Sequence, residues 1–121
     1  MAEILIVEDD LDLVETYTDL MESRGYSVIH ASRLSQAMEH LVNHSPGVIT
    51  LDLNLPGSSR MNMADFMYQA KALCNSKIIV ISGHPEMISG SDWIDDIDLI
   101  LSKPVDNNHL ILMIDRLLLS V

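Results

Sequence analysis

Two kinds of hydrophobic segment alternate along the chain. The first kind is a short run of mostly apolar, often β-branched residues without strict polar alternation, and five such runs occur, at residues 4–7, 27–30, 48–51, 78–81 and 99–101. Runs of this kind are typical of strands that are covered on both faces, as in a parallel sheet. The pattern therefore predicts five buried strands.

The second kind of segment is longer and carries apolar residues at helical spacing. Four such stripes extend over residues 13–21, 34–42, 63–74 and 110–121, and a further helix is expected between Pro85 and Asp96, where Gly90 interrupts the pattern. Strands and helices that alternate through short loops predict a doubly wound, five-stranded parallel α/β sheet with about five helices. We expect residues 1–121 to form this single domain.

Turn and cap residues agree with these boundaries. Gly25 follows the first helical stripe, and Ser32 is expected to cap the second helix. Pro46 and Gly47 break the chain before the third strand, and Pro104 ends the fifth. The elements are therefore separated by short turns.

Polar residues gather where the expected strands end. Five of them follow four of the strands: Glu8 and Asp9, Asp52, Ser82 and Lys103. In an open α/β sheet, ligands bind outside the carboxyl ends of the strands, near the point where the strand order reverses. We therefore expect these side chains to converge on one crevice. Asp10, which comes next along the chain, is interpreted as a helix cap.

These residue types suit phosphoryl transfer. Glu8, Asp9 and Asp52 would repel one another, and a hard divalent cation with oxygen ligands, most plausibly Mg²⁺, would relieve that repulsion. Asp52 could then attack a phosphoryl group as a nucleophile and form an aspartyl phosphate. The Lys103 ammonium and the Ser82 hydroxyl would contact the remaining phosphoryl oxygens, since such transfer depends on positioning and charge stabilisation.

Four segments occur in a matching order and spacing: ILIVEDD, LDLNLPG, VISGH and LSKP. With them the whole chain resembles the response-regulator receiver domain of bacterial two-component signalling, which has a flavodoxin-like fold. The resemblance implies that Asp52 is the phosphoacceptor and that Asp9 binds Mg²⁺ directly. It also implies that Glu8 reaches the ion through water and that the backbone carbonyl of Asn54 is a further ligand.

The same resemblance implies a signalling cycle. Ser82 would be the switch hydroxyl and Lys103 the phosphate-binding lysine, with a cis peptide before Pro104. A sensor histidine kinase or phosphotransfer protein would supply the phosphoryl group, as in a phosphorelay. The new charge would bias a two-state equilibrium at the face of the fourth helix, fifth strand and fifth helix. That face would contact an output domain or protein, or a second copy, and the chain would catalyse only its own phosphotransfer and dephosphorylation.

Two positions depart from the family's pattern. Ile100 stands where receivers usually carry an aromatic residue, and the segment PGSSRMNMAD lacks the glycine that receivers commonly carry a few residues beyond Pro56, which predicts a late or irregular third helix. These departures motivate an alternative, a degenerate receiver that acts as a phosphorylation-independent interaction module. His84 follows Ser82 by two residues and is a candidate for tuning the lifetime of the aspartyl phosphate.

Composition and net charge exclude some classes of binding partner. The 121 residues are 48% apolar and 21% charged, which is ordinary for a globular domain, and the formal net charge is −11. That charge argues against direct contact with nucleic acid or an anionic membrane. No apolar run approaches the roughly eighteen residues that a membrane span needs. Cys74 is the single cysteine, and the start of the chain lacks a signal peptide, so a cytoplasmic location is expected.

Other site interpretations are weaker. A haloacid-dehalogenase-type phosphatase would carry its nucleophile after the first strand, and a flavin binder would need a Ser/Thr/Gly-rich loop where this chain has EDDLDL. His40 and His44 stand four residues apart, but no third metal ligand is evident near them. Trp93, among acidic residues, is a candidate partner anchor.

Overall fold

Five strands and four α-helices alternate in the computed structural model, which describes residues 2–83 and 94–119. The elements in chain order are β1 (Glu3–Val7), α1 (Leu11–Glu22), β2 (Ser27–Ala31), α2 (Leu34–Asn43), β3 (Val48–Asp52), α3 (Arg60–Cys74), β4 (Lys77–Ser82), the 3-10 helix η2 (Ile94–Asp96), β5 (Leu99–Ser102) and α4 (Asn107–Leu119). The helix expected between Pro85 and Asp96 lies largely outside the described residues.

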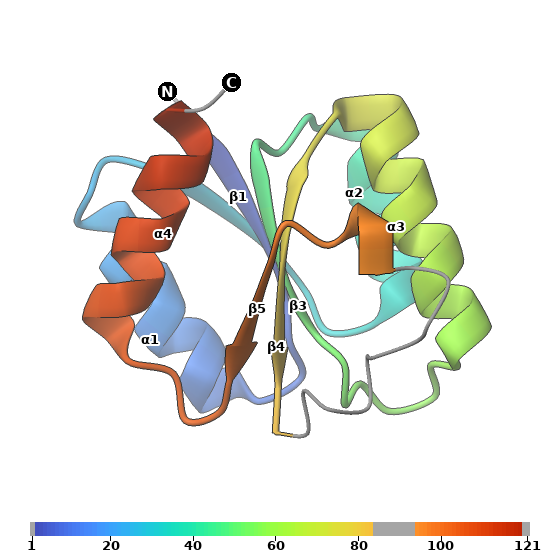
Figure 1. The fold of residues 1–121 in the computed structure, drawn as a ribbon, viewed down its shortest axis with the longest axis horizontal. Coiled ribbons are helices and arrows are strands. Elements are labelled where there is room, and N and C mark those ends of the chain that lie inside the picture. Colours follow the sequence, from blue (N-terminus) through green and yellow to red (C-terminus); the bar gives the residue numbers. More distant parts are fainter. Residues whose placement is uncertain (1, 84–93, 120–121) are drawn as a thin grey trace.

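The sheet is doubly wound. Its strand order is β2-β1-β3-β4-β5, and all neighbouring strands are parallel. Helices α1 and α4 cover one face, and α2 and α3 cover the other (Figure 1). The strand order reverses between β1 and β3, because the chain crosses from β1 to β2 on one side of this point and from β3 to β4 on the other. The predicted fold class is confirmed.

Successive strand residues feed two separate cores. In β1, Leu5 and Val7 belong to the core under α2 and α3, whereas Ile4 and Ile6 belong to the core under α1 and α4. All four are at most 1% exposed. This explains the missing polar alternation in the strand sequences, because both faces of a central parallel strand are covered.

Two helix starts follow from capping side chains. The Asp10 carboxylate accepts hydrogen bonds from the backbone N–H groups of Asp12 and Leu13, at 3.0 and 3.3 Å, so the predicted cap is confirmed. Ser59 caps α3 by accepting from Asn62 N at 3.1 Å. The third helix therefore has an ordinary capped start at Arg60, and the expectation of a late or irregular start was wrong because the Ser59 side chain caps the helix.

The predicted cap of α2 was also wrong. Arg33 occupies the N-cap position and makes no side-chain cap bond. Ser32 lies one residue earlier, and its N–H and hydroxyl donate to Gln36 Oε1 at 2.9 and 3.1 Å. The glutamine thus folds back over the turn and holds the residue that the sequence suggested as the cap.

Among the described helices, none has the length and hydrophobicity that a membrane crossing requires.

Candidate functional site

Strand register brings the predicted site residues to one edge of the sheet. Val7 is paired with Leu51, so the residues that follow them, Glu8 and Asp52, lie side by side. Asp52 is in turn paired with Ile81, which directly precedes Ser82. On the other side, Ser82 is paired with Ser102, and Lys103 follows. Residues from four separate segments therefore meet at the carboxyl edge.

The three acidic residues form a tight cluster. One carboxylate oxygen of each of Glu8, Asp9 and Asp52 lies within 4.8 Å of the others. Glu8 and Asp52 are buried, at 2% and 4% exposure, whereas Asp9 is exposed. The cluster predicted from the strand ends is thus assembled, with two carboxylates inside and one open to solvent.

Lys103 bridges the two buried carboxylates. Its Nζ lies 3.1 Å from Asp52 Oδ2 and 3.4 Å from Glu8 Oε1. The peptide between Lys103 and Pro104 is cis, as predicted. The backbone N–H of Lys103 donates to the Ser82 carbonyl at 2.9 Å, which ties the end of β5 to that of β4.

The three carboxylates of the site carry more negative charge than the single Lys103 ammonium can balance. Burial, together with hydrogen bonding to and charge repulsion from Asp52, raises the pKa of Glu8 from 4.5 to about 7, although the Asp10 N–H and Lys103 act in the opposite direction. Burial lowers the pKa of Lys103, but its contacts with Asp52 and Glu8 outweigh this effect and raise that pKa overall. A single ammonium therefore balances only part of the carboxylate charge.

The donor set fits a hard divalent cation. Three carboxylates converge, one of them reaches solvent, and such oxygen ligands with room for water are what Mg²⁺ prefers. Burial and, to a smaller extent, repulsion from Asp52 raise the pKa of Glu8, and a bound cation would favour the ionised carboxylate against both effects.

The Asp52 carboxylate is oriented from both sides. The backbone N–H of Asn54 donates to Asp52 Oδ1 at 2.9 Å, while Lys103 holds Oδ2. The Asn54 carbonyl as a ligand, and the Ser82 hydroxyl as a switch, stay predictions. Ser82 lies at the end of β4 and is 7% exposed.

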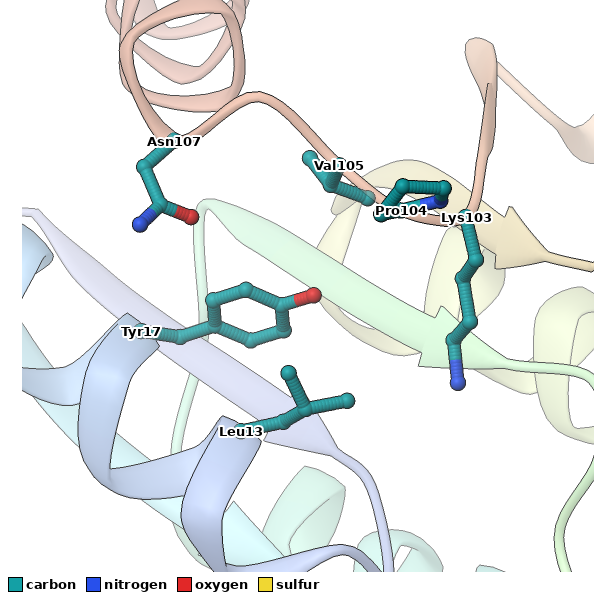
Figure 2. A pocket seen from close by; sticks show the side chains of 6 residues that line it. All are labelled: Leu13, Tyr17, Lys103, Pro104, Val105 and Asn107. Carbon is teal, nitrogen blue, oxygen red and sulfur yellow. The ribbon is translucent and has the colours of Figure 1, made fainter.

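A pocket of about 370 Å³ opens beside Lys103 (Figure 2). Its walls are mostly apolar and come from α1, from the loop between β5 and α4 and from the first residue of α4; the lining residues are Leu13, Tyr17, Lys103, Pro104, Val105 and Asn107. The sequence placed Leu13 and Tyr17 on the buried stripe of the first helix. The structure shows that these two residues also line the pocket beside Lys103.

Several other predicted candidates have structural partners or lie elsewhere. His44 Nδ1 contacts the Glu3 carboxylate at 3.1 Å, and His40 Nε2 contacts the His30 carbonyl at 2.9 Å, so each of these two rings has a protein partner. His84 and Trp93 lie outside the described residues. Ile100 is paired with Val80 and packs, partly buried, on the core under α2 and α3.

Sequence reasoning missed His30. Its Nε2 lies 3.0 Å from the Glu8 carbonyl oxygen. The available signal was a polar residue near the end of an otherwise apolar strand, at the same sheet edge as Glu8.

Comparison with known proteins agrees with this geometry. The sequence profile described as the response regulator receiver domain matches residues 4–115. The phosphoglycerate transport system transcriptional regulatory protein PgtA of Salmonella typhimurium is 28% identical over 115 residues, which are 94% of this chain and 27% of PgtA. The transcriptional regulatory protein CpxR homolog of Haemophilus influenzae is 26% identical over 119 residues, 98% of this chain and 51% of that protein. This chain spans about half or less of the length of these curated relatives.

A solved structure matches the whole fold. The crystal structure of a sensor protein from Polaromonas sp. JS666 superimposes with a TM-score of 0.85 at 26% identity, and the match covers 98% of this chain and 97% of that one.

Proposed function

Because this chain belongs to the response regulator receiver family, we propose that it is a phosphorylation-controlled signalling switch whose phosphoacceptor is Asp52. One observation carries the assignment. The buried Asp52 carboxylate is held between Lys103 Nζ at 3.1 Å and Asn54 N at 2.9 Å, inside a cluster of three acidic residues. Burial of a carboxylate costs free energy of folding, so a buried carboxylate held in place by two contacts indicates a chemical role.

The acidic cluster is the proposed magnesium site. Asp9 and Asp52 would bind the ion directly, Glu8 through water, and Asn54 through its backbone carbonyl. When bound, Mg²⁺ would neutralise charge on the carboxylates and on the incoming phosphoryl oxygens. The exposed side chain of Asp9 and the two buried carboxylates beside it support this arrangement.

In the proposed transfer, a carboxylate oxygen of Asp52 attacks phosphorus on a phosphohistidine donor. The new phosphorus–oxygen bond forms as the phosphorus–nitrogen bond breaks, and the released imidazole takes up a proton. Lys103 already lies 3.1 Å from Asp52 and would contact a phosphoryl oxygen, while the Ser82 hydroxyl would contact another. The chain catalyses only this transfer and the later hydrolysis, not turnover of a separate substrate.

The proposed partners follow from that chemistry. A sensor histidine kinase or phosphotransfer protein donates the phosphoryl group, in the cytoplasm. The described part of the expected output face, which is β5 and α4, then contacts an output domain, an output protein or a second copy of this chain. With Ile100 in β5, the signal would pass through aliphatic repacking instead of the movement of an aromatic ring.

The alternative, an interaction module that works without phosphorylation, finds no support in the site. Asp52 contacts Lys103 and lies within the acidic cluster, which is the arrangement that the proposed transfer needs. Of the two departures, Ile100 packs on the core under α2 and α3, and the segment after Pro56 leads into a helix that Ser59 caps.

A small phosphodonor tests the proposal directly. The full chain is incubated with acetyl phosphate and Mg²⁺, and its intact mass is measured. We expect a gain of one phosphoryl group that is lost with EDTA and with Asp52→Asn, and kept with Asp65→Asn, which changes an exposed aspartate on α3. A wild-type chain without any mass gain, or a gain that persists in Asp52→Asn, would contradict the assignment.

A further inference from the structure

One peptide unit connects the two acidic residues of the first strand end, and it is held on both sides. Its carbonyl, that of Glu8, lies 3.0 Å from His30 Nε2. Its N–H, that of Asp9, donates to Glu8 Oε2 at 3.0 Å, and the next N–H, that of Asp10, donates to the same oxygen at 3.3 Å. The orientation of the Glu8–Asp9 peptide is therefore determined by two hydrogen bonds, one of which comes from another strand.

Strand pairing explains why a side chain is used. Val7 is paired with Ala31, the last residue of β2, and Glu8 N donates to the Ala31 carbonyl at 3.0 Å. Beyond Ala31 the chain turns toward α2, so β2 no longer continues the ladder alongside Glu8. The His30 ring supplies the donor in place of a backbone N–H.

The backbone of His30 is held from α2. His40 on α2 places its Nε2 2.9 Å from the His30 carbonyl. A carbonyl oxygen can only accept a hydrogen bond, so both imidazoles must carry the hydrogen on Nε2. The two histidines form a chain of ring-to-carbonyl contacts from α2 through β2 to the acidic edge.

We propose that His30 is a positioning residue for the divalent cation: by holding the Glu8 carbonyl, it keeps the Glu8 and Asp9 carboxylates turned toward Asp52. The inference rests on the proposed function. Among the described residues, no hydrogen bond holds the exposed Asp9 carboxylate, so the Glu8–Asp9 peptide is what sets the direction in which this side chain leaves the backbone. Its oxygen nevertheless lies within 4.8 Å of oxygens of Glu8 and Asp52.

Two amide substitutions separate the hydrogen bond from the ring. The amide nitrogen of glutamine reaches the place of a histidine Nε2, whereas that of asparagine reaches only the place of Nδ1. We compare His30→Gln, His30→Asn and the control His109→Asn, which changes an exposed histidine on α4. Magnesium binding to the full chain is measured by calorimetry without a phosphodonor, and folding is measured by thermal unfolding in EDTA.

We expect His30→Asn to raise the Mg²⁺ dissociation constant by about tenfold, which is the lower end of the loss in affinity seen when residues that orient metal ligands are changed. His30→Gln should stay within about twofold of wild type, as should His109→Asn, because neither loses the contact to Glu8. If the asparagine variant is too unstable to titrate, His30→Leu, which keeps the volume, carries the same expectation.

A kinetic readout excludes a merely structural effect. With acetyl phosphate, the Mg²⁺ concentration for half-maximal phosphorylation should rise in His30→Asn while the maximal rate is kept. Because Mg²⁺ binding would also refold a partly unfolded chain and so shift the midpoint, the assay is run at a temperature at which unfolding in EDTA shows every variant to be fully folded.

Equal Mg²⁺ affinities for wild type, His30→Gln and His30→Asn would overturn the inference and leave the proposed function intact. Equally weak binding by both variants would overturn it too, since the amide would then fail to replace the ring. A wild-type chain that binds no Mg²⁺ would overturn the inference and the proposed metal site together.

Discussion

Substitution of Glu8 by glutamine measures how much the buried carboxylate charge costs the folded chain. Glu8 is 2% exposed and lies beside Asp52, and burial, helped by Asp52, raises its pKa from 4.5 to about 7. The folded chain therefore holds this proton to higher pH than the unfolded chain does. Glutamine has nearly the same shape and cannot ionise, so Glu8→Gln removes this titration.

The shift fixes the sign and size of the effect. A carboxyl whose pKa is raised by folding stabilises the chain below its unfolded pKa, and that stability is lost as the pH rises through the folded pKa. For a shift from 4.5 to about 7, the full loss is about 3 kcal/mol. Between about pH 5 and about pH 8, wild type should lose about 2–3 kcal/mol relative to Glu8→Gln.

Urea unfolding in EDTA checks this expectation. The free energies of unfolding of wild type, Glu8→Gln and Glu15→Gln are compared at several pH values in that range. Glu15 is exposed on α1, so its glutamine variant should follow wild type at every pH. A constant difference between wild type and Glu8→Gln, or one that shrinks with rising pH, would refute the electrostatic account of the site.

Three further outcomes are expected. Mg²⁺ at ten times its dissociation constant should stabilise the wild-type chain by about 1.4 kcal/mol near neutral pH, and EDTA should reverse the change in Tm; no shift in Tm would contradict the metal site. Phe66→Ala, at a side chain 1% exposed on α3, should lower the free energy of urea unfolding by about 3–5 kcal/mol, whereas Tyr68→Ala, at 63% exposure on the same helix, should stay within about 0.5 kcal/mol. Tyr26→Phe removes a hydrogen bond from the Tyr26 hydroxyl to Asp115 and should cost about 1 kcal/mol in the same assay, a loss that must disappear in the Asp115→Ala background if the bond is its cause.

The strands were predictable because burial on both faces leaves a strong local signal. The run at residues 48–51 differs from β3 by a single added residue, and β3 is buried throughout. Asp10 as a cap was also readable, since it precedes an amphipathic stripe directly. Ser32 showed the limit of such local signals, because Ser32, Arg33 and Ser35 all stand near the start of α2 and the helix begins after Arg33, one residue later than expected.

The acidic cluster was predictable from topology without coordinates. In a parallel sheet, residues that end neighbouring strands must lie at one edge, so Glu8 and Asp52 were brought together by the strand pattern alone. His30 was not predictable in the same way. Whether its ring reaches the Glu8 carbonyl depends on where β2 stops pairing with β1 and on a rotamer, neither of which hydrophobic periodicity records.

The order of apolar and polar residues by itself determined the layers, the parallel sheet and the edge at which the polar side chains gather, because burial and strand direction act through local pattern. The tertiary structure decided how those side chains share charge. Lys103 contacts Asp52 and Glu8 across about fifty and about ninety-five residues of chain, and burial of both carboxylates raises the pKa of Glu8. Distances and desolvation of this kind arise from packing between elements, which no single segment of the sequence contains.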